Sequence, residues 1–541
     1  MRRAALVLFF VTAMAAEPAD VFRYGRFEHT FTSAKDHANP LKEEVLVRFE
    51  GPNGARDEVP AFWDGGRRWK VRYSPELTGN WKFSTAAADT GDNGLHAQTG
   101  AFKVSSYRGA NELYRKGAPH LSANRRYFVQ GYNKPWFWLG DTAWNGALMA
   151  TVEEWQRYLA DRAARKFTAI QVVTTQWRAG RADEKGLVAF TGTESIRVNP
   201  AFFQRLDERM NAVNDAGLVA VPVVLWALTS KDRESPGEAL PTDQAILLAR
   251  YIVARYGAHH VIWMLGGDGN YEGAANVEKW KQIGRAVFPK GRWRRPVSLH
   301  PRGMRAPWQP FKDEEWLDVF AYQSGHGSDA DKWRWNAQQG PAVDWRMEPP
   351  RPVVDTEINY EGHLSYRDNK VIDDGAVRRA AWYSLLAAPP AGVTYGAHGI
   401  WPWIRKPEVP LDHPRSGVAK PWTEYLDAPG ARQMTVIRDV LQSMEWWTLR
   451  PDRKLLASEP QDAEFGNYPM PARSEDGRAA LLYLPANPSI ELDLSGFKSD
   501  VRAIWIDPRT GARRPGGRLR PGYGVTVKAP SGSDWLLLLR K

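Results

Sequence analysis

Short segments near both ends of the chain alternate between apolar and polar residues. An alternation with a period of two, interrupted by Gly, Pro, Asn and Asp, is typical of antiparallel strands with one buried face. The segments are residues 44–50, 69–73 and 79–83 near the N-terminus, and residues 479–484, 489–494, 501–507 and 533–539 near the C-terminus. The pattern predicts a β-sandwich domain over residues 17–110 and a second one over residues 446–541.

Between residues 111 and 445, short apolar runs alternate with longer amphipathic segments, which predicts strands that alternate with helices. The predicted helices are residues 152–167, 200–217, 243–258, 277–288 and 375–388. The predicted strands are residues 136–139, 169–173, 218–227, 261–265, 296–299, 319–322, 352–355 and 392–401. Eight such units predict an α/β fold, a (β/α)₈ TIM barrel flanked by the two sandwiches. No Gly-x-Gly-x-x-Gly follows the first strand and no P-loop occurs, which argues against dinucleotide and NTP binding.

Two of the apolar runs end in carboxylates. Residues 261–270 read Val-Ile-Trp-Met-Leu-Gly-Gly-Asp-Gly-Asn, and residues 353–360 read Val-Val-Asp-Thr-Glu-Ile-Asn-Tyr. Active sites of such barrels lie at the C-terminal strand ends, so we expect Asp268, after strand four, and Glu357, at the end of strand seven, to face each other. Strand alternation further predicts that Asp355 and Glu357 point the same way.

A pair of carboxylic acids across a barrel mouth predicts a glycosidase, because hydrolysis of a glycosidic bond uses one ionised and one protonated carboxyl group. Glu357 is the predicted nucleophile of a retaining mechanism and Asp268 the predicted acid/base. Glu361 is the nearest alternative nucleophile. Each carboxylate also has a structural alternative: Glu357 can cap the next loop or pair with an arginine, and Asp268 can belong to an Asp-Gly turn.

Further polar and aromatic residues follow the predicted strands and are candidates for substrate binding, since indole rings suit the apolar face of a sugar. They are Asp141, Trp144, Trp177, Trp226, Tyr322, His326, Tyr360 and Trp401. Asp141 can instead cap the segment after it, and each tryptophan can instead belong to the core. Tyr322, Gln323 and His326 are placed to hydrogen-bond the nucleophile.

The composition narrows the chemistry. The chain has 25 Trp in 541 residues, which favours a carbohydrate ligand, and no Cys, which excludes thiol catalysis and cysteine metal sites. His326, His363 and His398 lack the spacing of metal ligands, so no metal and no cofactor is predicted. The net charge of +11 suits an anionic polysaccharide. Because the arginines are dispersed along the chain, nucleic acid is not the expected partner.

The N-terminus predicts export. Met-Arg-Arg precedes a short apolar run and Ala13-Met14-Ala15, the arrangement of a cleavable signal peptide over residues 1–16. The absence of Cys argues against a lipid anchor, and no later apolar run is long enough to span a bilayer. We expect a periplasmic or secreted protein with no membrane contact after cleavage.

Three segments, residues 137–144, 263–270 and 355–361, resemble the apiosidase-like glycoside hydrolase family. The N-terminal sandwich is similar to the domain that often precedes such barrels, and the C-terminal one to a domain type named after collagen binding. The resemblance implies a (β/α)₈ hydrolase whose catalytic residues match Asp268 and Glu357. It also implies release of apiose from branched pectin, the family's characterised activity. Many related barrels have Asn-Glu after strand four, where this chain has Gly267-Asp268.

Two other functions fit parts of the pattern. A non-catalytic carbohydrate-binding surface protein on a degenerate barrel would keep the aromatic residues without a working carboxylate pair. An esterase or lyase is the third possibility, but no Gly-x-Ser-x-Gly nucleophile elbow supports it.

Overall fold

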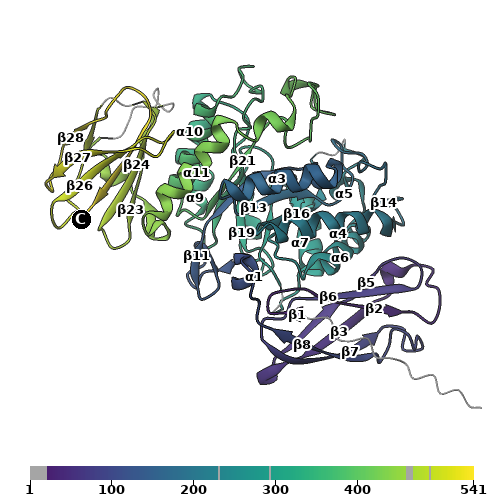
Figure 1. Cartoon of the computed structure of the whole chain (residues 1–541). Coiled ribbons are helices and arrows are strands. Elements are labelled where there is room, and N and C mark those ends of the chain that lie inside the picture. Colours follow the sequence, from purple (N-terminus) through teal and green to yellow (C-terminus); the bar gives the residue numbers. More distant parts are fainter. Residues whose placement is uncertain (1–20, 229–231, 292–293, 459–466, 487–488) are drawn as a thin grey trace, which may run out of the picture.

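A computed structural model describes residues 21–228, 232–291, 294–458, 467–486 and 489–541. The predicted signal peptide, residues 1–16, lies outside the described residues. The chain forms a central barrel with a β-sandwich on either side of it (Figure 1). No helix among the described residues is long and apolar enough to cross a bilayer.

The N-terminal sandwich packs two sheets around aromatic and aliphatic side chains such as Val47, Phe49, Val71 and Trp81. The first sheet has the order β1 (Val21–Phe22), β8 (Thr99–Ser105), β7 (Gly79–Ala87), β3 (Val45–Glu50) and β4 (Arg56–Pro60). The second has the order β2 (Phe27–Thr32), β6 (Arg68–Tyr73) and β5 (Phe62–Trp63). Buried positions alternate with partly buried or exposed ones along β3, as the sequence pattern predicts.

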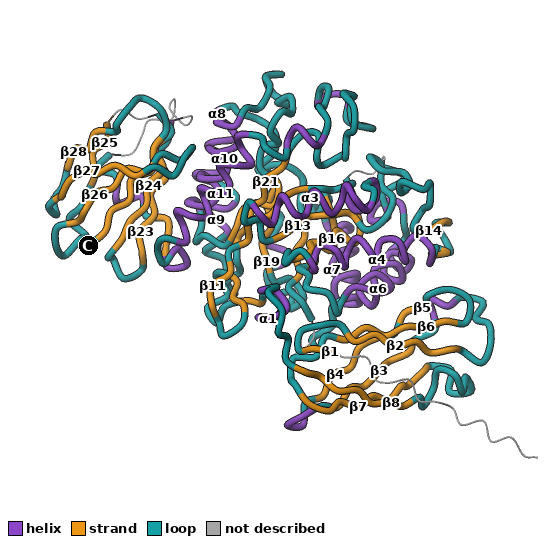
Figure 2. The backbone as a smooth tube through the Cα atoms, in the orientation of Figure 1, coloured by secondary structure: helices purple, strands orange, loops and turns teal. Residues whose placement is uncertain are grey.

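Eight parallel strands close the central barrel, and purple helices surround its orange strands in Figure 2. In barrel order they are β12 (Trp138–Thr142), β13 (Ala169–Val173), β16 (Val219–Trp226), β17 (Trp263–Gly267), β18 (Val297–Leu299), β19 (Val319–Gln323), β20 (Val353–Glu357) and β21 (Gly392–Gly396). All their residues are buried, because helices cover the outer face and side chains fill the interior. The predicted fold class is therefore confirmed.

The long helices follow the barrel strands and cover them. They are α3 (Val152–Ala164), α4 (Pro200–Asp215), α6 (Thr242–Tyr256), α7 (Ala274–Val287), α8 (Ala330–Gln338), α10 (Asp374–Ala387) and α11 (Pro429–Gln442). Shorter helices and strands lie in the connections: α1 (Glu112–Lys116), α2 (Gly146–Met149), α5 (Pro236–Ala239), α9 (Pro341–Asp344), β9 (His120–Leu121), β10 (Phe128–Gln130), β11 (Lys134–Trp136), β14 (Phe190–Thr191) and β15 (Arg197–Val198). Thr151 and Glu154 form a capping box that starts α3.

The C-terminal domain has a six-stranded sheet and a two-stranded sheet. Their orders are β22 (Leu449–Pro451), β23 (Met470–Ser474), β24 (Ala479–Leu484), β29 (Trp535–Arg540), β26 (Val501–Ile506) and β27 (Arg513–Leu519), and β25 (Ser489–Leu492) with β28 (Val525–Lys528). Leu536 and Leu538 of β29 belong to the core that includes the barrel, whereas Leu537 and Leu539 face the domain's own core. Both faces of β29 are buried, which explains its continuous apolar sequence.

Buried ion pairs join each sandwich to the barrel. Arg72 of β6 contacts Asp207 of α4 through two hydrogen bonds of 3.0 and 2.6 Å, and Asp207 also accepts from Arg255 of α6. At the other junction Arg378 of α10 donates to Asp534 at 2.6 and 3.0 Å. Bidentate pairs of this kind fix orientation as well as contact.

Candidate active site

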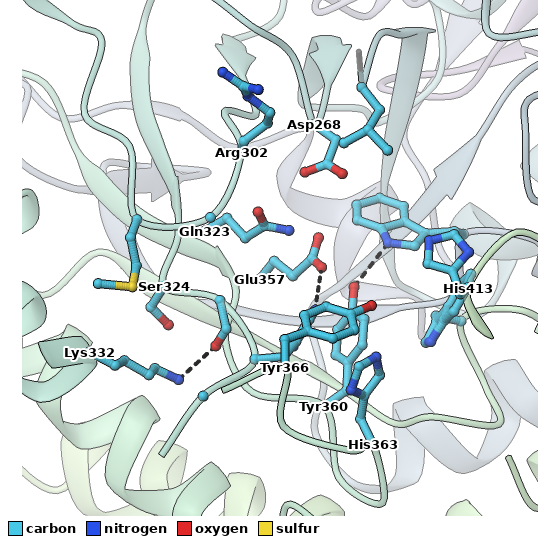
Figure 3. Close-up of a pocket in the computed structure, with 18 of the residues that line it drawn as sticks. Asp268, Arg302, Gln323, Ser324, Lys332, Glu357, Tyr360, His363, Tyr366 and His413 are labelled. Carbon is cyan, nitrogen blue, oxygen red and sulfur yellow. Dashed lines mark hydrogen bonds and ion pairs between the residues drawn. The ribbon is translucent and has the colours of Figure 1, made fainter. Parts of the chain in front are cut away.

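A cavity of about 300 Å³ opens at the C-terminal ends of the barrel strands. Asp268 and Glu357 both line it, and Figure 3 shows their carboxylates directed into the same space. The other lining side chains are mostly aromatic, imidazole or cationic. They include Trp144, Trp177, Trp226, Arg302, Met304, Gln323, His326, Lys332, Tyr360, His363, Tyr366, Arg367, Trp401 and His413.

A β-bulge in strand seven directs Glu357 into this cavity. Tyr322 pairs with Asp355 and Gln323 pairs with Glu357, so Thr356 is the extra residue on β20. Asp355 faces the outer helices, because it accepts a hydrogen bond of 2.7 Å from Ser384 of α10. The prediction that Asp355 and Glu357 point the same way is therefore wrong, since the bulge interrupts the strand alternation on which it relied.

Two histidines hold the Glu357 carboxylate. His300 Nε2 lies 2.9 Å from Oε2, and His326 Nε2 lies 2.9 Å from Oε1. Burial disfavours the charged form, but the hydrogen bonds and charges of the two histidines outweigh it and hold the pKa of Glu357 well below its usual range. The Tyr360 hydroxyl accepts a hydrogen bond from Trp144 Nε1 at 2.9 Å. Glu357 is thus held in the ionised form.

Asp268 has a different environment. It adopts a left-handed backbone conformation with φ of 55°, directly after Gly266 and Gly267. A Cβ atom at Gly267 would lie 2.5 Å from the Trp226 ring, so the turn needs glycine there. No side chain among the described residues donates a hydrogen bond to the Asp268 carboxylate. Burial, and then the charge of Glu357, raise the pKa of Asp268 to about 7.

Tryptophan and histidine rings form one wall of the cavity. The ring centroids of Trp177 and Trp226 are 4.3 Å apart, those of Trp144 and Trp226 are 5.2 Å apart, and those of Trp401 and His413 are 4.7 Å apart. Trp177 Nε1 donates to Asn145 Oδ1 at 2.6 Å, which fixes the ring. Such a wall suits a sugar ring placed beside the two carboxylates.

Of the predicted substrate-binding residues, Trp144, Trp177, Trp226, His326, Tyr360 and Trp401 line the cavity. Asp141 and Tyr322 do not, which corrects the prediction that they bind substrate. Asp141 is fully buried and accepts hydrogen bonds from Tyr158 and Arg162 of α3 at 2.7 and 2.5 Å. The Tyr322 hydroxyl is directed outward and donates to Asp344 at 2.7 Å.

Glu361, the alternative nucleophile, also lies outside this cavity. Its carboxylate accepts a hydrogen bond of 2.6 Å from the Tyr395 hydroxyl and two of 3.1 Å from the Gly430 N–H group. Because these partners satisfy the buried carboxylate, the burial of Glu361 needs no catalytic explanation.

Sequence reasoning missed His300 and Arg302. His300 directly follows the predicted strand at residues 296–299, so the rule that selected Asp268 and Glu357 could have found it. Arg302 follows two residues later and lines the cavity. No described residue hydrogen-bonds or pairs with its guanidinium, and its Nε is buried.

No group of three or more His, Asp or Glu side chains within the described parts of the chain is arranged to hold a metal ion. His363 and His398 approach each other, with ring centroids 4.9 Å apart. However, His398 is engaged by the Ser416 hydroxyl, 3.1 Å from its Nε2, and by the Gly362 carbonyl, 3.2 Å from its Nδ1. This cluster is a hydrogen-bonded support for the loop after strand seven.

Comparison with protein families and solved structures agrees with this geometry. Residues 122–448 match the family model "Apiosidase-like, catalytic domain". Residues 20–88 match "Domain of unknown function (DUF5060)", and residues 450–540 match "Putative collagen-binding domain of a collagenase". Comparison with curated proteins gave no match.

Solved structures of glycoside hydrolases share the fold. One is 23% identical, with a TM-score of 0.67 over 79% of this chain and 97% of the other. A family 5 glycoside hydrolase from Bacteroides vulgatus is 21% identical, with a TM-score of 0.67 over 79% and 93%. A structure titled as a "putative glycoside hydrolase" from the same species is 17% identical, with a TM-score of 0.70 over 96% and 99%. The chain belongs to the apiosidase-like catalytic domain family and is a glycoside hydrolase.

Proposed function

We propose that the protein is an exported, retaining glycoside hydrolase that removes a terminal sugar from a side chain of a plant or microbial polysaccharide. The observation that carries this proposal is the contrast between the surroundings of two carboxyl groups in one cavity. Glu357 is held ionised by His300 and His326, while the pKa of Asp268 is raised to about 7. A nucleophile must be ionised and a proton donor must be protonated, so the pair suits the two roles.

In the first step of the proposed mechanism, Glu357 attacks the anomeric carbon, and the bond from that carbon to the glycosidic oxygen breaks. The electron pair goes to the leaving oxygen, which takes the proton of Asp268. In the second step Asp268, now ionised, takes a proton from water, and the hydroxide oxygen displaces Glu357 from the anomeric carbon. Both carboxyl groups return to their starting protonation states.

The cavity favours a small sugar unit. Its volume of about 300 Å³ is near the lower end of the range for ligand pockets, about 300–1,000 Å³, which supports exo action. The family name points to apiose as the sugar to test first. Because Arg302 has no partner among the described residues and lines the same cavity as the Gln323 amide, we infer that a carboxylate group of an anionic chain, such as pectin, binds there.

Export to the periplasm or the medium rests on the predicted signal peptide. Expression of the full chain with a C-terminal tag, followed by fractionation and N-terminal sequencing, tests it. A mature protein that begins near residue 17 in the periplasm or medium is expected. Uncleaved protein in the cytoplasm would contradict this part of the proposal.

The decisive experiment measures sugar release from a panel of aryl glycosides and pectic oligosaccharides, with ¹H NMR to follow the first anomer formed. Retention of configuration with release of a single terminal sugar is expected. Inversion would reject the nucleophilic role of Glu357, since an inverting enzyme uses that carboxylate to activate water. Release of internal fragments would reject exo action.

A further inference from the structure

The two histidines beside Glu357 are held in different ways. His300 has both ring nitrogens engaged, because Nδ1 lies 2.9 Å from Thr356 Oγ1 and Nε2 lies 2.9 Å from Glu357 Oε2. His326 contacts Glu357 through Nε2, but its Nδ1 has no hydrogen-bond partner in the described part of the chain. The neighbours of His300 therefore determine its ring orientation and which of its ring nitrogens are protonated. The neighbours of His326 do not determine both.

The Thr356 hydroxyl decides which atom carries a proton. Oγ1 lies 2.9 Å from the backbone carbonyl oxygen of Tyr322, and a carbonyl can only accept. The single hydroxyl proton of Thr356 is therefore donated to Tyr322. Oγ1 can then only accept from His300, so His300 Nδ1 must carry a proton.

The second nitrogen follows from the same argument. At 2.9 Å, a lone pair on His300 Nε2 facing a lone pair on Glu357 Oε2 would be repulsive, so one proton lies between them. We propose that Thr356 is a positioning residue that holds His300 with Nδ1 protonated, so that His300 forms an imidazolium ion pair with Glu357 whenever Glu357 is ionised. This inference rests on the proposed role of Glu357 as the nucleophile.

The bulge in strand seven makes this arrangement possible, because it places Thr356 as the extra residue between Asp355 and Glu357. The other groups around His300 are the Asp268 carboxyl, whose ionisation its charge favours, and the rings of Trp144 and Trp226, with centroids at 5.7 and 6.4 Å. Arg302 follows His300 by two residues in the sequence and lines the cavity. The Glu357 carboxylate is the acid in hydrogen-bond contact with the ring.

A histidine held in this way keeps its protons through the reaction. When Glu357 forms the glycosyl ester through Oε1, Oε2 becomes a carbonyl oxygen and still accepts the Nε2 proton. The proton transferred to the leaving group then comes from Asp268. His300 thus stabilises the charge of the nucleophile without acting as an acid or base.

Nitrogen NMR of the full chain labelled with ¹⁵N-histidine tests the proposal directly. The chain has only 11 His, and the variant His300→Gln identifies the two ring signals. Both ring nitrogens of His300 should be protonated at neutral pH, where Glu357 is ionised. A wild-type spectrum with one unprotonated ring nitrogen would overturn the proposal, and this result is independent of any glycosidase activity.

A matched pair of variants tests the role of Thr356. Thr356→Val removes the acceptor at nearly the same volume, and Thr356→Ser keeps it. The valine variant should show an unprotonated ring nitrogen on His300 and move the acidic limb of kcat/KM to higher pH by about one unit, a tenfold loss on that limb, while the serine variant resembles wild type.

Equal behaviour of the two variants would contradict the proposed role of Thr356. If the valine variant does not fold, the wild-type spectrum still decides. Protonated His300 in a protein that cleaves no substrate would leave the inference standing and reject the proposed function.

Discussion

Asp268 and Glu357 share one cavity but differ in what surrounds them. Glu357 receives hydrogen bonds from His300 and His326, which follow strands five and six, whereas no described side chain donates to Asp268, which follows two glycines in a left-handed turn. The histidines lower the pKa of one acid, and burial raises the pKa of the other. Strand position brings two carboxyl groups together, but neighbouring strands assign their chemical roles.

A third strand-end acid extends the comparison. Asp141 lies one residue before the end of strand one, and Glu357 is the last residue of strand seven. However, the Asp141 carboxylate accepts hydrogen bonds from Tyr158 and Arg162 of α3, and Asp141 does not line the cavity. A carboxylate at a barrel mouth is thus available for catalysis only when the adjacent helix leaves it unpaired.

The largest expected effect is that of Glu357→Gln, because no other described acid in the cavity is held ionised to replace the nucleophile. The value of kcat should fall by about 10⁴-fold or more on every substrate. Steady-state kinetics with the best substrate of the panel measures it. Glu361→Gln is the control, since Glu361 lies outside the cavity, and its kcat should stay within about tenfold of wild type. Equal losses of kcat in both variants would contradict the assignment of Glu357 as the nucleophile.

Asp268→Asn should have a smaller effect that depends on the leaving group. On sugar leaving groups, which need a proton, kcat/KM should fall by about 10²- to 10⁴-fold. The acidic phenol of an activated aryl glycoside leaves as a phenolate without protonation. The loss of kcat/KM on such substrates should therefore be much smaller. Kinetics over a series of phenols of increasing pKa measures the difference. The same loss on all leaving groups would mean that Asp268 is not the proton donor.

The pH dependence tests the same contrast in the wild-type enzyme. Asp268 has a raised pKa of about 7 and must be protonated to act, so activity is present below this pH and is lost as the pH rises through it. We expect kcat/KM to fall about tenfold per pH unit well above pH 7. In Glu357→Gln the like charge is absent, so ¹³C NMR should show Asp268 titrating at lower pH. An unchanged titration would mean that the two acids do not interact.

Arg302→Met should have the smallest effect. Loss of a charge-assisted hydrogen bond costs about 1.5–3 kcal/mol, so KM for carboxylated oligosaccharides should rise about ten- to a hundredfold, while neutral aryl glycosides are unaffected. Arg367→Met is the matched control, because Arg367 also lines the cavity but already pairs with Asp329 at 3.2 Å. A uniform effect of Arg302→Met on neutral and anionic substrates would reject a carboxylate subsite.

Much of the architecture followed from local patterns. The strand β13 has its predicted bounds, Ala169–Val173, and the predicted runs at 261–265 and 352–355 differ from β17 and β20 by two residues at the C-terminal end. Those ends contain the Gly-Gly pair and Thr356-Glu357, where an apolar run gives way to small or polar residues. Periodicity detects burial, so it stops where a strand emerges at a functional site.

The sequence by itself determined that eight buried parallel strands close a barrel, that Asp268 follows one of them and that Glu357 ends another, because periods of 2.0 and 3.6 residues are properties of adjacent positions. Only the tertiary structure decided what each carboxylate contacts. The bulge at Thr356, the approach of His300 from strand five and the pairing of Asp141 with Arg162 all depend on residues brought together from separate segments. Contacts between distant segments do not follow a repeating pattern in the sequence, yet they determine the charge of each acid and hence its role.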